Sequence, residues 1–321
     1  MAQVAVVLMN LGGPDSLDAV RPFLVNLFND PAIIGVPSVL RWPLARLIAW
    51  RRAPVAREIY ARLGGRSPLL ANTQEQAQAL ERVLGAGYRC FVAMRYWRPY
   101  STETVREVVE WGADEIVCLP LYPQFSMTTT ASSLTSWKLA ARQHRLDSPT
   151  RCVRSYPCEA GLIEALVRLI RPALDAATST GRSPRLLLTA HGLPMKIVRS
   201  GDPYPNQVEE TAAAVVEALA WPGLDWRVCY QSRVGPLRWL EPATEDEIRR
   251  AGRERVPLVV APISFVSEHS ETLVELDLDY RAVAEASGVP AYHRVATVGV
   301  EPGFIEALAA LVQRARSRAP M

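Results

Sequence analysis

The chain alternates short apolar runs with amphipathic helical patterns, and this alternation restricts the fold more than any other feature of the sequence. Each run is bounded by Gly, Pro or charged residues, as at residues 4–10 (VAVVLMN). Strands that alternate with helices form parallel sheets covered by helices. The expected strands are residues 4–10, 89–94, 115–121, 151–155, 185–190, 226–230, 257–264 and 291–295. We therefore predict an α/β protein with two doubly wound domains, each with a parallel four-stranded sheet flanked by helices.

Similar turn sequences in the two halves indicate an internal duplication. LMNLGGP at 8–14 aligns with LTAHGLP at 188–194, and AMRYWRP at 93–99 resembles QSRVGP at 231–236. In this register His191 occupies the position that Leu11 has in the first half. The halves would share a backbone, while only the second has a titratable ring directly after its first strand.

Charge and motif content exclude several classes of protein. The 36 basic and 33 acidic residues give a net charge of +3, which is too balanced to favour nucleic acid as a partner. No apolar stretch approaches the roughly 18 residues that span a bilayer, and we expect no secretory signal and a cytoplasmic location. Five cysteines without a C-x-x-C pair favour neither a disulfide framework nor a zinc site. Because G-x-G-x-x-G and the P-loop sequence are absent, nucleotide-driven chemistry is not expected.

The interval after the first strand is longer in the first half, and the surplus is apolar and aromatic. It contains IIGVPSVLRWPLARLIAWRRAP at 33–54, with Arg51 and Arg52 near its end. A buried helix pair with a basic end would explain this composition. An exposed apolar lip, at about residues 33–52, would explain it equally well, by covering a flat apolar ligand or resting on a membrane surface.

Candidate catalytic residues lie where the expected strands end, because ligands of parallel α/β sheets bind beyond the carboxyl ends of the strands. His191 directly follows the run 185–190, and His269 follows the run 257–264. If the next segment is an α-helix, four carboxylates recur on one face at i, i+3, i+7 and i+11, namely Glu268, Glu271, Glu275 and Asp279.

Such an acidic face is often merely solvated, but this one has no Lys or Arg at i+4 to offset its charge. Carboxylates that lead to a histidine can relay protons or pass a divalent cation. The pattern predicts a flat, apolar substrate, with a ring base on one side of it and an acidic path for a metal ion on the other.

The sequence resembles the ferrochelatase family over nearly its whole length. The similarity rests on LMNLGGPDSLDAVRPFLVNLFNDP (8–31), RRAPVAREIYARLGGRSP (51–68), YPQFSMTTTASS (122–133), LTAHGLPMKIVRSGDPYP (188–205), YQSRVGPLRWLEP (230–242) and FVSEHSETLVELDLDY (265–280). The resemblance implies two similar Rossmann-like domains and the ATP-independent insertion of ferrous iron into protoporphyrin IX, the last step of haem synthesis. We expect the first domain at 1–157, joined by a C-terminal helix at 303–318, and the second at 158–302.

The resemblance also implies roles for individual residues. His191 would accept pyrrole protons or bind the metal, and Glu271 would stand on the opposite face of the macrocycle; these two are the candidate catalytic residues. The candidate iron ligands are His191, Glu271, Glu275 and His269. The candidate porphyrin contacts are Leu11, Arg51, Arg52, Tyr60, Arg95, Tyr96, Ser126 and Trp239. The lip would take porphyrin from a membrane surface, so a peripheral location on the inner membrane is expected.

The sequence departs from some relatives in its cysteines. Relatives with an iron–sulfur cluster have most of its ligands in a cysteine-rich C-terminal tail, whereas no cysteine follows Cys229 here. Met127 also stands where such a relative has a ligand, so we expect no cluster and no cofactor, with iron a substrate. The alternatives are a chelatase for cobalt or coproporphyrin, and a non-catalytic tetrapyrrole carrier, which would not need both His191 and Glu271. The oligomeric state stays open.

Overall fold

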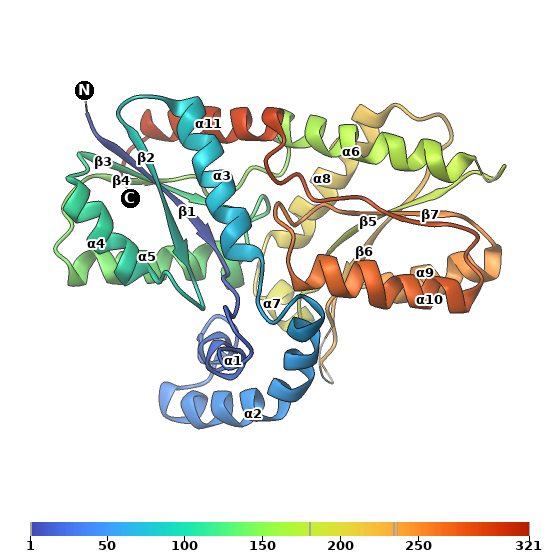
Figure 1. The fold of residues 1–321 in the computed structure, drawn as a ribbon, viewed down its shortest axis with the longest axis horizontal. Coiled ribbons are helices and arrows are strands. Elements are labelled where there is room, and N and C mark those ends of the chain that lie inside the picture. Colours follow the sequence, from blue (N-terminus) through green and yellow to red (C-terminus); the bar gives the residue numbers. More distant parts are fainter. Residues whose placement is uncertain (1, 180, 234, 236, 321) are drawn as a thin grey trace. The chain divides into compact units, whose positions relative to one another are not determined.

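The protein contains two compact units, each built on its own parallel sheet. The computed structural model describes residues 2–179, 181–233, 235 and 237–320. Unit 1 consists of Met1–Ser155 and Leu308–Met321, and unit 2 consists of Tyr156–Ala307. Each unit has four parallel strands flanked by helices (Figure 1). The predicted α/β fold with two helix-flanked, four-stranded sheets is confirmed.

The sheet of unit 1 has the strand order β2-β1-β3-β4. Its strands are β1 (Val4–Asn10), β2 (Tyr88–Met94), β3 (Glu115–Pro120) and β4 (Thr150–Cys152). Every residue of β1 is buried, as expected for a central strand of a sheet covered on both faces. The helices are α1 (Val20–Phe28), α2 (Ser38–Arg62), α3 (Leu69–Leu84), α4 (Ser101–Trp111) and α5 (Ser132–Gln143), with the short π-helix η1 (Met127–Ala131) before α5.

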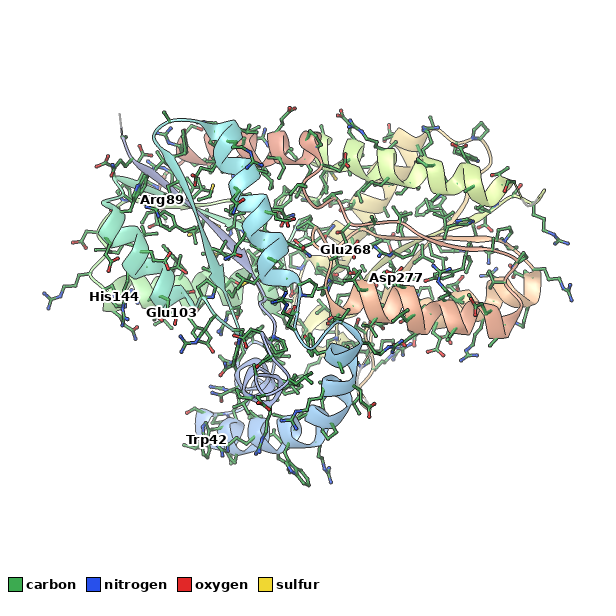
Figure 2. All side chains as sticks on the ribbon, viewed as in Figure 1. Trp42, Arg89, Glu103, His144, Glu268 and Asp277 are labelled. Atoms are coloured by element: carbon green, nitrogen blue, oxygen red, sulfur yellow. The ribbon has the colours of Figure 1, made fainter. Side chains whose placement is uncertain are left out.

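The apolar segment at 33–54 lies mostly in α2, and α2 has two different sides. Its small residues Ala45, Ala49 and Ala53 are buried, and the last two belong to a core cluster with residues of α1. Its large apolar side chains are exposed, among them Val39, Leu40, Trp42, Leu47 and Trp50, and Figure 2 labels Trp42 on this helix. Across the described residues, no helix combines the length and apolar character needed to cross a bilayer. The segment is thus a helix packed on one side, with an uncovered apolar face on the other.

The sheet of unit 2 has the equivalent strand order β6-β5-β7-β8. Its strands are β5 (Arg185–His191), β6 (Asp225–Gln231), β7 (Leu258–Pro262) and β8 (Tyr292–Arg294). The helices are α6 (Ala160–Thr178), α7 (Met195–Arg199), α8 (Tyr204–Leu219), α9 (Thr244–Glu254), the π-helix η2 (Glu271–Asp279), α10 (Tyr280–Ser287) and α11 (Pro302–Arg316). Because unit 1 resumes at Leu308, α11 contributes residues to both units.

The two sheets match in register as well as in strand order, which supports the predicted duplication. Met9 pairs with Pro120 between β1 and β3, and Thr189 pairs with Pro262 between β5 and β7. In both sheets, the residue after the proline donates its N–H to the carbonyl of the residue that pairs with the proline. Leu121 N donates to Met9 O at 2.8 Å, and Ile263 N donates to Thr189 O at 3.0 Å. Residues 234 and 236 of the second turn match lie outside the described part of the chain.

Candidate active site

His191 ends β5, at the carboxyl edge of the sheet of unit 2. The preceding strand residues are buried, whereas the His191 side chain is 38% exposed. Gly192 then turns the chain across the end of β6, and its N–H donates to the carbonyl of Gln231 at 2.9 Å. A Cβ on residue 192 would lie 2.9 Å from that carbonyl oxygen, so only glycine fits here without a shift. The local sequence thus brings an accessible imidazole to the edge where ligands of such sheets bind.

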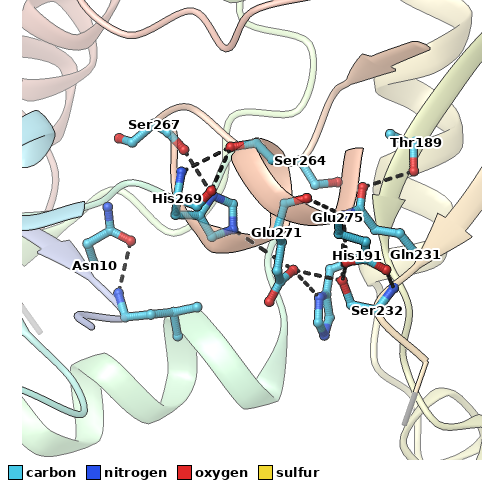
Figure 3. Close-up of polar contacts among 12 residues, drawn as sticks. Asn10, Thr189, His191, Gln231, Ser232, Ser264, Ser267, His269, Glu271 and Glu275 are labelled. Carbon is cyan, nitrogen blue, oxygen red and sulfur yellow. Dashed lines mark hydrogen bonds and ion pairs between the residues drawn. The ribbon is translucent and has the colours of Figure 1, made fainter. Parts of the chain in front are cut away.

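Glu271 contacts His191 directly. Its Oε2 lies 2.8 Å from Nδ1 of His191 and accepts a hydrogen bond from Ser232 Oγ at 3.0 Å (Figure 3). The predicted placement of Glu271 on the opposite face of the macrocycle is therefore wrong, because no flat ring fits between atoms at hydrogen-bond distance. The two residues are 80 positions apart in the sequence, which gives no sign of a contact between them, and only the fold brings Glu271 of η2 beside the end of β5.

The acidic segment is a π-helix, not the α-helix that the spacing argument assumed. Glu271 begins η2 and Asp279 ends it, while Glu268 lies before its start. Outside this helix, Glu268 accepts a hydrogen bond from Nη1 of Arg294 at 2.5 Å. The predicted four-carboxylate face is wrong in this respect. The i→i+5 bonding of a π-helix is rare in proteins, and where it does occur it is often at a functional site.

Glu275 accepts hydrogen bonds on both carboxylate oxygens. Oε1 accepts from Ser232 N at 2.8 Å and from Tyr280 OH at 2.8 Å. Oε2 accepts from Ser232 Oγ at 2.5 Å and from Gln231 Nε2 at 3.2 Å. The Ser232 hydroxyl therefore lies within hydrogen-bond distance of both Glu271 and Glu275, which share its single proton. Ser232 has a left-handed backbone conformation with φ of 61°. Sequence reasoning missed Ser232, Gln231 and Tyr280, although Gln231 ends β6 and Ser232 follows it directly, where site residues are expected.

His269 lies in the loop between β7 and η2. Its Nε2 is 3.9 Å from Oε2 of Glu271, and its Nδ1 is 3.2 Å from the carbonyl of Ser267. The ring of Phe265 lies 4.6 Å from the His269 ring and approaches His191 edge-on at 6.5 Å, between centroids. Phe265 thus gives the two histidines a shared apolar neighbour, which the sequence argument did not single out.

The charges of this cluster shift its pKa values in opposite directions. Desolvation lowers the pKa of His191, but the charge and hydrogen bond of Glu271, together with the charge of Glu275, raise it by more. For Glu271, desolvation raises the pKa, but His191 and His269 lower it by more and hold it well below its usual range. Burial and the charge of Glu271 raise the pKa of Glu275 despite the donors from Ser232 and Tyr280. The pair His191–Glu271 is therefore an imidazolium–carboxylate ion pair below the raised pKa of His191.

The candidate iron ligands come together only in part. His191, His269 and Glu275 all lie near Glu271, but Glu275 is held by donors from β6 and α10. Within the described residues, no three His, Cys, Asp or Glu side chains are grouped so that they could hold a metal ion as they stand. Their assignment as iron ligands stays a prediction.

Most candidate porphyrin contacts lie in unit 1, and two of them contact a buried carboxylate that the sequence did not reveal. Asp30 is 3% exposed; it pairs with Nη2 of Arg95 at 2.8 Å and accepts hydrogen bonds from Tyr96 OH at 2.9 Å and from Ser132 Oγ. Asp30 therefore fixes the direction of the Arg95 guanidinium, and Tyr96 itself is buried.

The other candidates differ in accessibility. Tyr60 and Ser126 are buried, Leu11 and Arg52 are half-buried, and Arg51 is exposed. In unit 2, Trp239 is half-buried and pairs with Pro194 across an isolated bridge, next to the turn that follows His191. Contact of these residues with a porphyrin stays a prediction.

Comparison with known proteins places this site in one family. The sequence profile described as Ferrochelatase matches residues 3–316. Proteins named ferrochelatase from Caulobacter vibrioides and Wolbachia pipientis wMel are 53% and 48% identical; the matches cover 99% and 96% of this chain, and 92% and 98% of those proteins.

The structural similarity extends to a chelatase with little sequence identity. The sirohydrochlorin chelatase SirB from Bacillus subtilis subspecies spizizenii, solved with cobalt, has a TM-score of 0.57 at 12% identity, over 98% of this chain and 95% of that one. That likeness shows the fold alone. The match of the whole sequence, with its His191–Glu271 pair at the carboxyl edge of a parallel sheet, shows that the chain belongs to the ferrochelatase family, the metal chelatases of haem biosynthesis.

Proposed function

We propose that this chain inserts ferrous iron into protoporphyrin IX, with His191 as the base that accepts the pyrrole protons. The contact of 2.8 Å between His191 Nδ1 and Glu271 Oε2 is the observation that carries the proposal. Because Nδ1 faces the carboxylate, Nε2 is the nitrogen left for a substrate proton, and the ring is exposed enough to be reached.

The arrangement suits removal of two N–H protons from the macrocycle. Neutral His191 donates Nδ1–H to Glu271, which directs the Nε2 lone pair outward. When Nε2 accepts a pyrrole proton, the Glu271 carboxylate stabilises the imidazolium, as the acid of a catalytic triad does. Distortion of the planar macrocycle would expose the nitrogen lone pairs to iron, and binding energy from its periphery would supply that strain.

Glu275 and His269 are proposed to lie on the route of iron and of the departing protons. Glu275 connects to Glu271 through the Ser232 hydroxyl, at 2.5 and 3.0 Å. Carboxylates and imidazoles bind ferrous iron less firmly than thiolates do, which suits a passing substrate. For the periphery, Arg51, Arg52 and Arg95 are proposed to hold the propionates, and Leu11, Tyr60, Tyr96, Ser126 and Trp239 the ring.

The cysteines support a reaction without an iron–sulfur cluster. Cys118 and Cys152 are neighbours on β3 and β4 of unit 1, while Cys229 is buried in the core of unit 2. Two neighbouring thiols do not meet the four-cysteine requirement of such a cluster. We therefore propose that the residues present do not fit one.

Replacement of His191 tests the proposed base. We expect His191→Ala to lose at least about a hundredfold in metallation rate, the usual contribution of a positioned acid–base group. Binding of protoporphyrin, measured by quenching of protein fluorescence, should stay close to that of the unchanged protein. His293→Ala is the control, because His293 lies on β8 of the same unit, and the polar contacts of Glu271 in the described part of the chain do not include it. An anaerobic assay with ferrous iron and either protoporphyrin or coproporphyrin measures both variants. Normal turnover in His191→Ala contradicts the proposal.

The uncovered face of α2 is proposed to rest on the cytoplasmic surface of the inner membrane. Trp42 and Trp50 are 53% and 59% exposed, and Arg46 lies 4.7 Å from the centre of the Trp42 ring. Exposed indoles among arginines suit the interface of an anionic bilayer.

Sedimentation with vesicles tests this surface. We expect Trp42→Ser and Trp50→Ser to weaken binding to vesicles that contain phosphatidylglycerol, because each removes buried apolar area at the interface. Leu139→Ser, on α5 of the same unit and 55% exposed, is the matched control. Equal binding of all three variants would count against a membrane role for α2.

A further inference from the structure

Two buried tyrosines contact η2 in chemically different ways. Tyr280 begins α10 and Tyr292 begins β8, and each is 8% exposed. Each hydroxyl donates a hydrogen bond of 2.8 Å to a residue of η2. Tyr292 donates to the backbone carbonyl of Leu276, whereas Tyr280 donates to the side-chain Oε1 of Glu275.

The Tyr280 bond completes a set of contacts around Glu275. Ser232 and Gln231 hold the carboxylate from the end of β6, and Ser232 reaches both oxygens. Among the described donors to Glu275, only Tyr280 comes from a helix, α10, and it donates to Oε1. Bonds from two sides fix the rotation of the carboxylate, which points Oε2 at the hydroxyl that also contacts Glu271.

We infer that Tyr280 is a positioning residue for Glu275. Its hydroxyl keeps the carboxylate in the orientation that connects it, through Ser232, with Glu271. This inference rests on the proposed function, which places Glu275 on the route of iron. Tyr280 does not touch iron or porphyrin in this account; it acts only through the carboxylate.

The surroundings of Tyr280 allow its hydroxyl to be removed without loss of packing. The ring belongs to the hydrophobic core of unit 2, with Cys229, Ile248 and Ala284. Tyr292 belongs to the same cluster and is equally buried. Tyr280→Phe and Tyr292→Phe therefore remove the same atom from the same core, and only the first frees a carboxylate of the site.

Steady-state kinetics of the two variants provide the test. We expect Tyr280→Phe to raise the KM for ferrous iron about tenfold, in the range found when a partner of a metal-binding group is lost, with kcat within about twofold. Tyr292→Phe should leave both parameters within about twofold. Any fall in melting temperature should be equal in the two variants, so a loss of stability would not explain a difference in KM. Equal kinetics in the two variants, or a fall in kcat without a rise in KM, would overturn the inference.

The variant Glu275→Gln separates failure of this inference from failure of the proposed function. If Tyr280 acts through Glu275, adding Tyr280→Phe to Glu275→Gln should raise the KM no further. A further rise as large as in the single variant refutes the positioning role. If Glu275→Gln has a normal KM, the proposed iron route is wrong, and the inference is then decided by a crystal structure of Tyr280→Phe. An unmoved Glu275 side chain in that structure would refute it, and a rotated one would support it.

Discussion

At the scale of single residues, the protonation of His191 depends on the carboxylates beside it, and most of all on Glu271. Glu271 raises the pKa of His191 against the opposite effect of desolvation. Below that raised pKa the ring is already protonated and accepts no pyrrole proton. Turnover should therefore rise with pH through the pKa of His191, because the neutral ring is the active base.

Glu271→Gln should lower the pKa of His191, because it removes the largest effects that raise this pKa, the charge and the hydrogen bond of Glu271, while desolvation still lowers it. Titration of the imidazole Cε1–H signal by NMR measures this directly. The rise of turnover with pH should move to lower pH, on a maximum reduced by at least about a hundredfold. Glu210→Gln, which changes an exposed carboxylate on α8, serves as the control. An unchanged titration of His191 in Glu271→Gln would show that the pair does not form in solution.

The sequence was informative about His191 for a physical reason. An apolar run precedes this ring and a glycine turn follows it, as at the end of a buried strand, so its position at a strand end could be predicted. Ser232 has no such signal, because serine is common in turns and its left-handed φ of 61° is visible only in the fold. Asp30 was missed for a similar reason: its partners Arg95, Tyr96 and Ser132 are distant in sequence.

At the scale of elements, the strands could be predicted closely and η2 could not. Apolar runs bounded by Gly and Pro occur wherever a parallel strand is buried on both faces. In η2, the buried residues Thr272, Val274 and Leu276 alternate with residues that are only half-buried, such as Leu273. A π-helix changes which positions share a face, so α-helical spacing does not predict where the carboxylates of η2 lie.

The Arg294 ion pairs are expected to stabilise the region around η2. Arg294, 10% exposed on its side chain, pairs with Asp277 of η2 and with Glu268 of the preceding loop, each at 2.5 Å. Arg294→Met leaves two carboxylates without this partner and should lower the free energy of unfolding by about 2–3 kcal/mol, somewhat less than for a fully buried pair. Arg249→Met, which breaks an exposed pair with Glu245, should cost at most about 0.5 kcal/mol. Urea unfolding compares them, and equal losses would show that the Arg294 pairs contribute no more than a surface pair.

At the scale of the whole molecule, the repeated strand order followed from the turn sequences, whereas the return of a C-terminal helix to the first domain was expected only from the resemblance to the family. Turn sequences showed the duplication because both halves need the same backbone at the same strand ends. Unit 1, however, includes Leu308–Met321, and Leu308 and Val312 are fully buried. Arg316 also pairs with Glu115 of β3 at 3.0 Å.

A chain that ends at Ala307 should therefore lose structure in unit 1 and keep it in unit 2. Removal of Leu308 and Val312 exposes the core that they cover. Truncation of one buried leucine alone lowers the free energy of unfolding by about 2–5 kcal/mol. Hydrogen exchange should become fast in β1 to β3 and remain slow in β5 to β7. A chain that ends at Arg318 keeps all of α11 and is the control. Continued protection of β1 in the shorter chain would contradict the prediction.

The split composition of unit 1 also determines the order in which the chain can fold during its synthesis. Unit 2 is one continuous segment, Tyr156–Ala307, and can fold as soon as that segment has left the ribosome. Residues 1–155 are made first, yet their unit lacks Leu308–Met321 until these residues have also been made, about 10 to 30 s later at bacterial rates of elongation. For that interval the first half of the nascent chain is an incomplete domain with apolar surface uncovered. It is therefore the half of the newborn chain that chaperones should bind, although it is the older one.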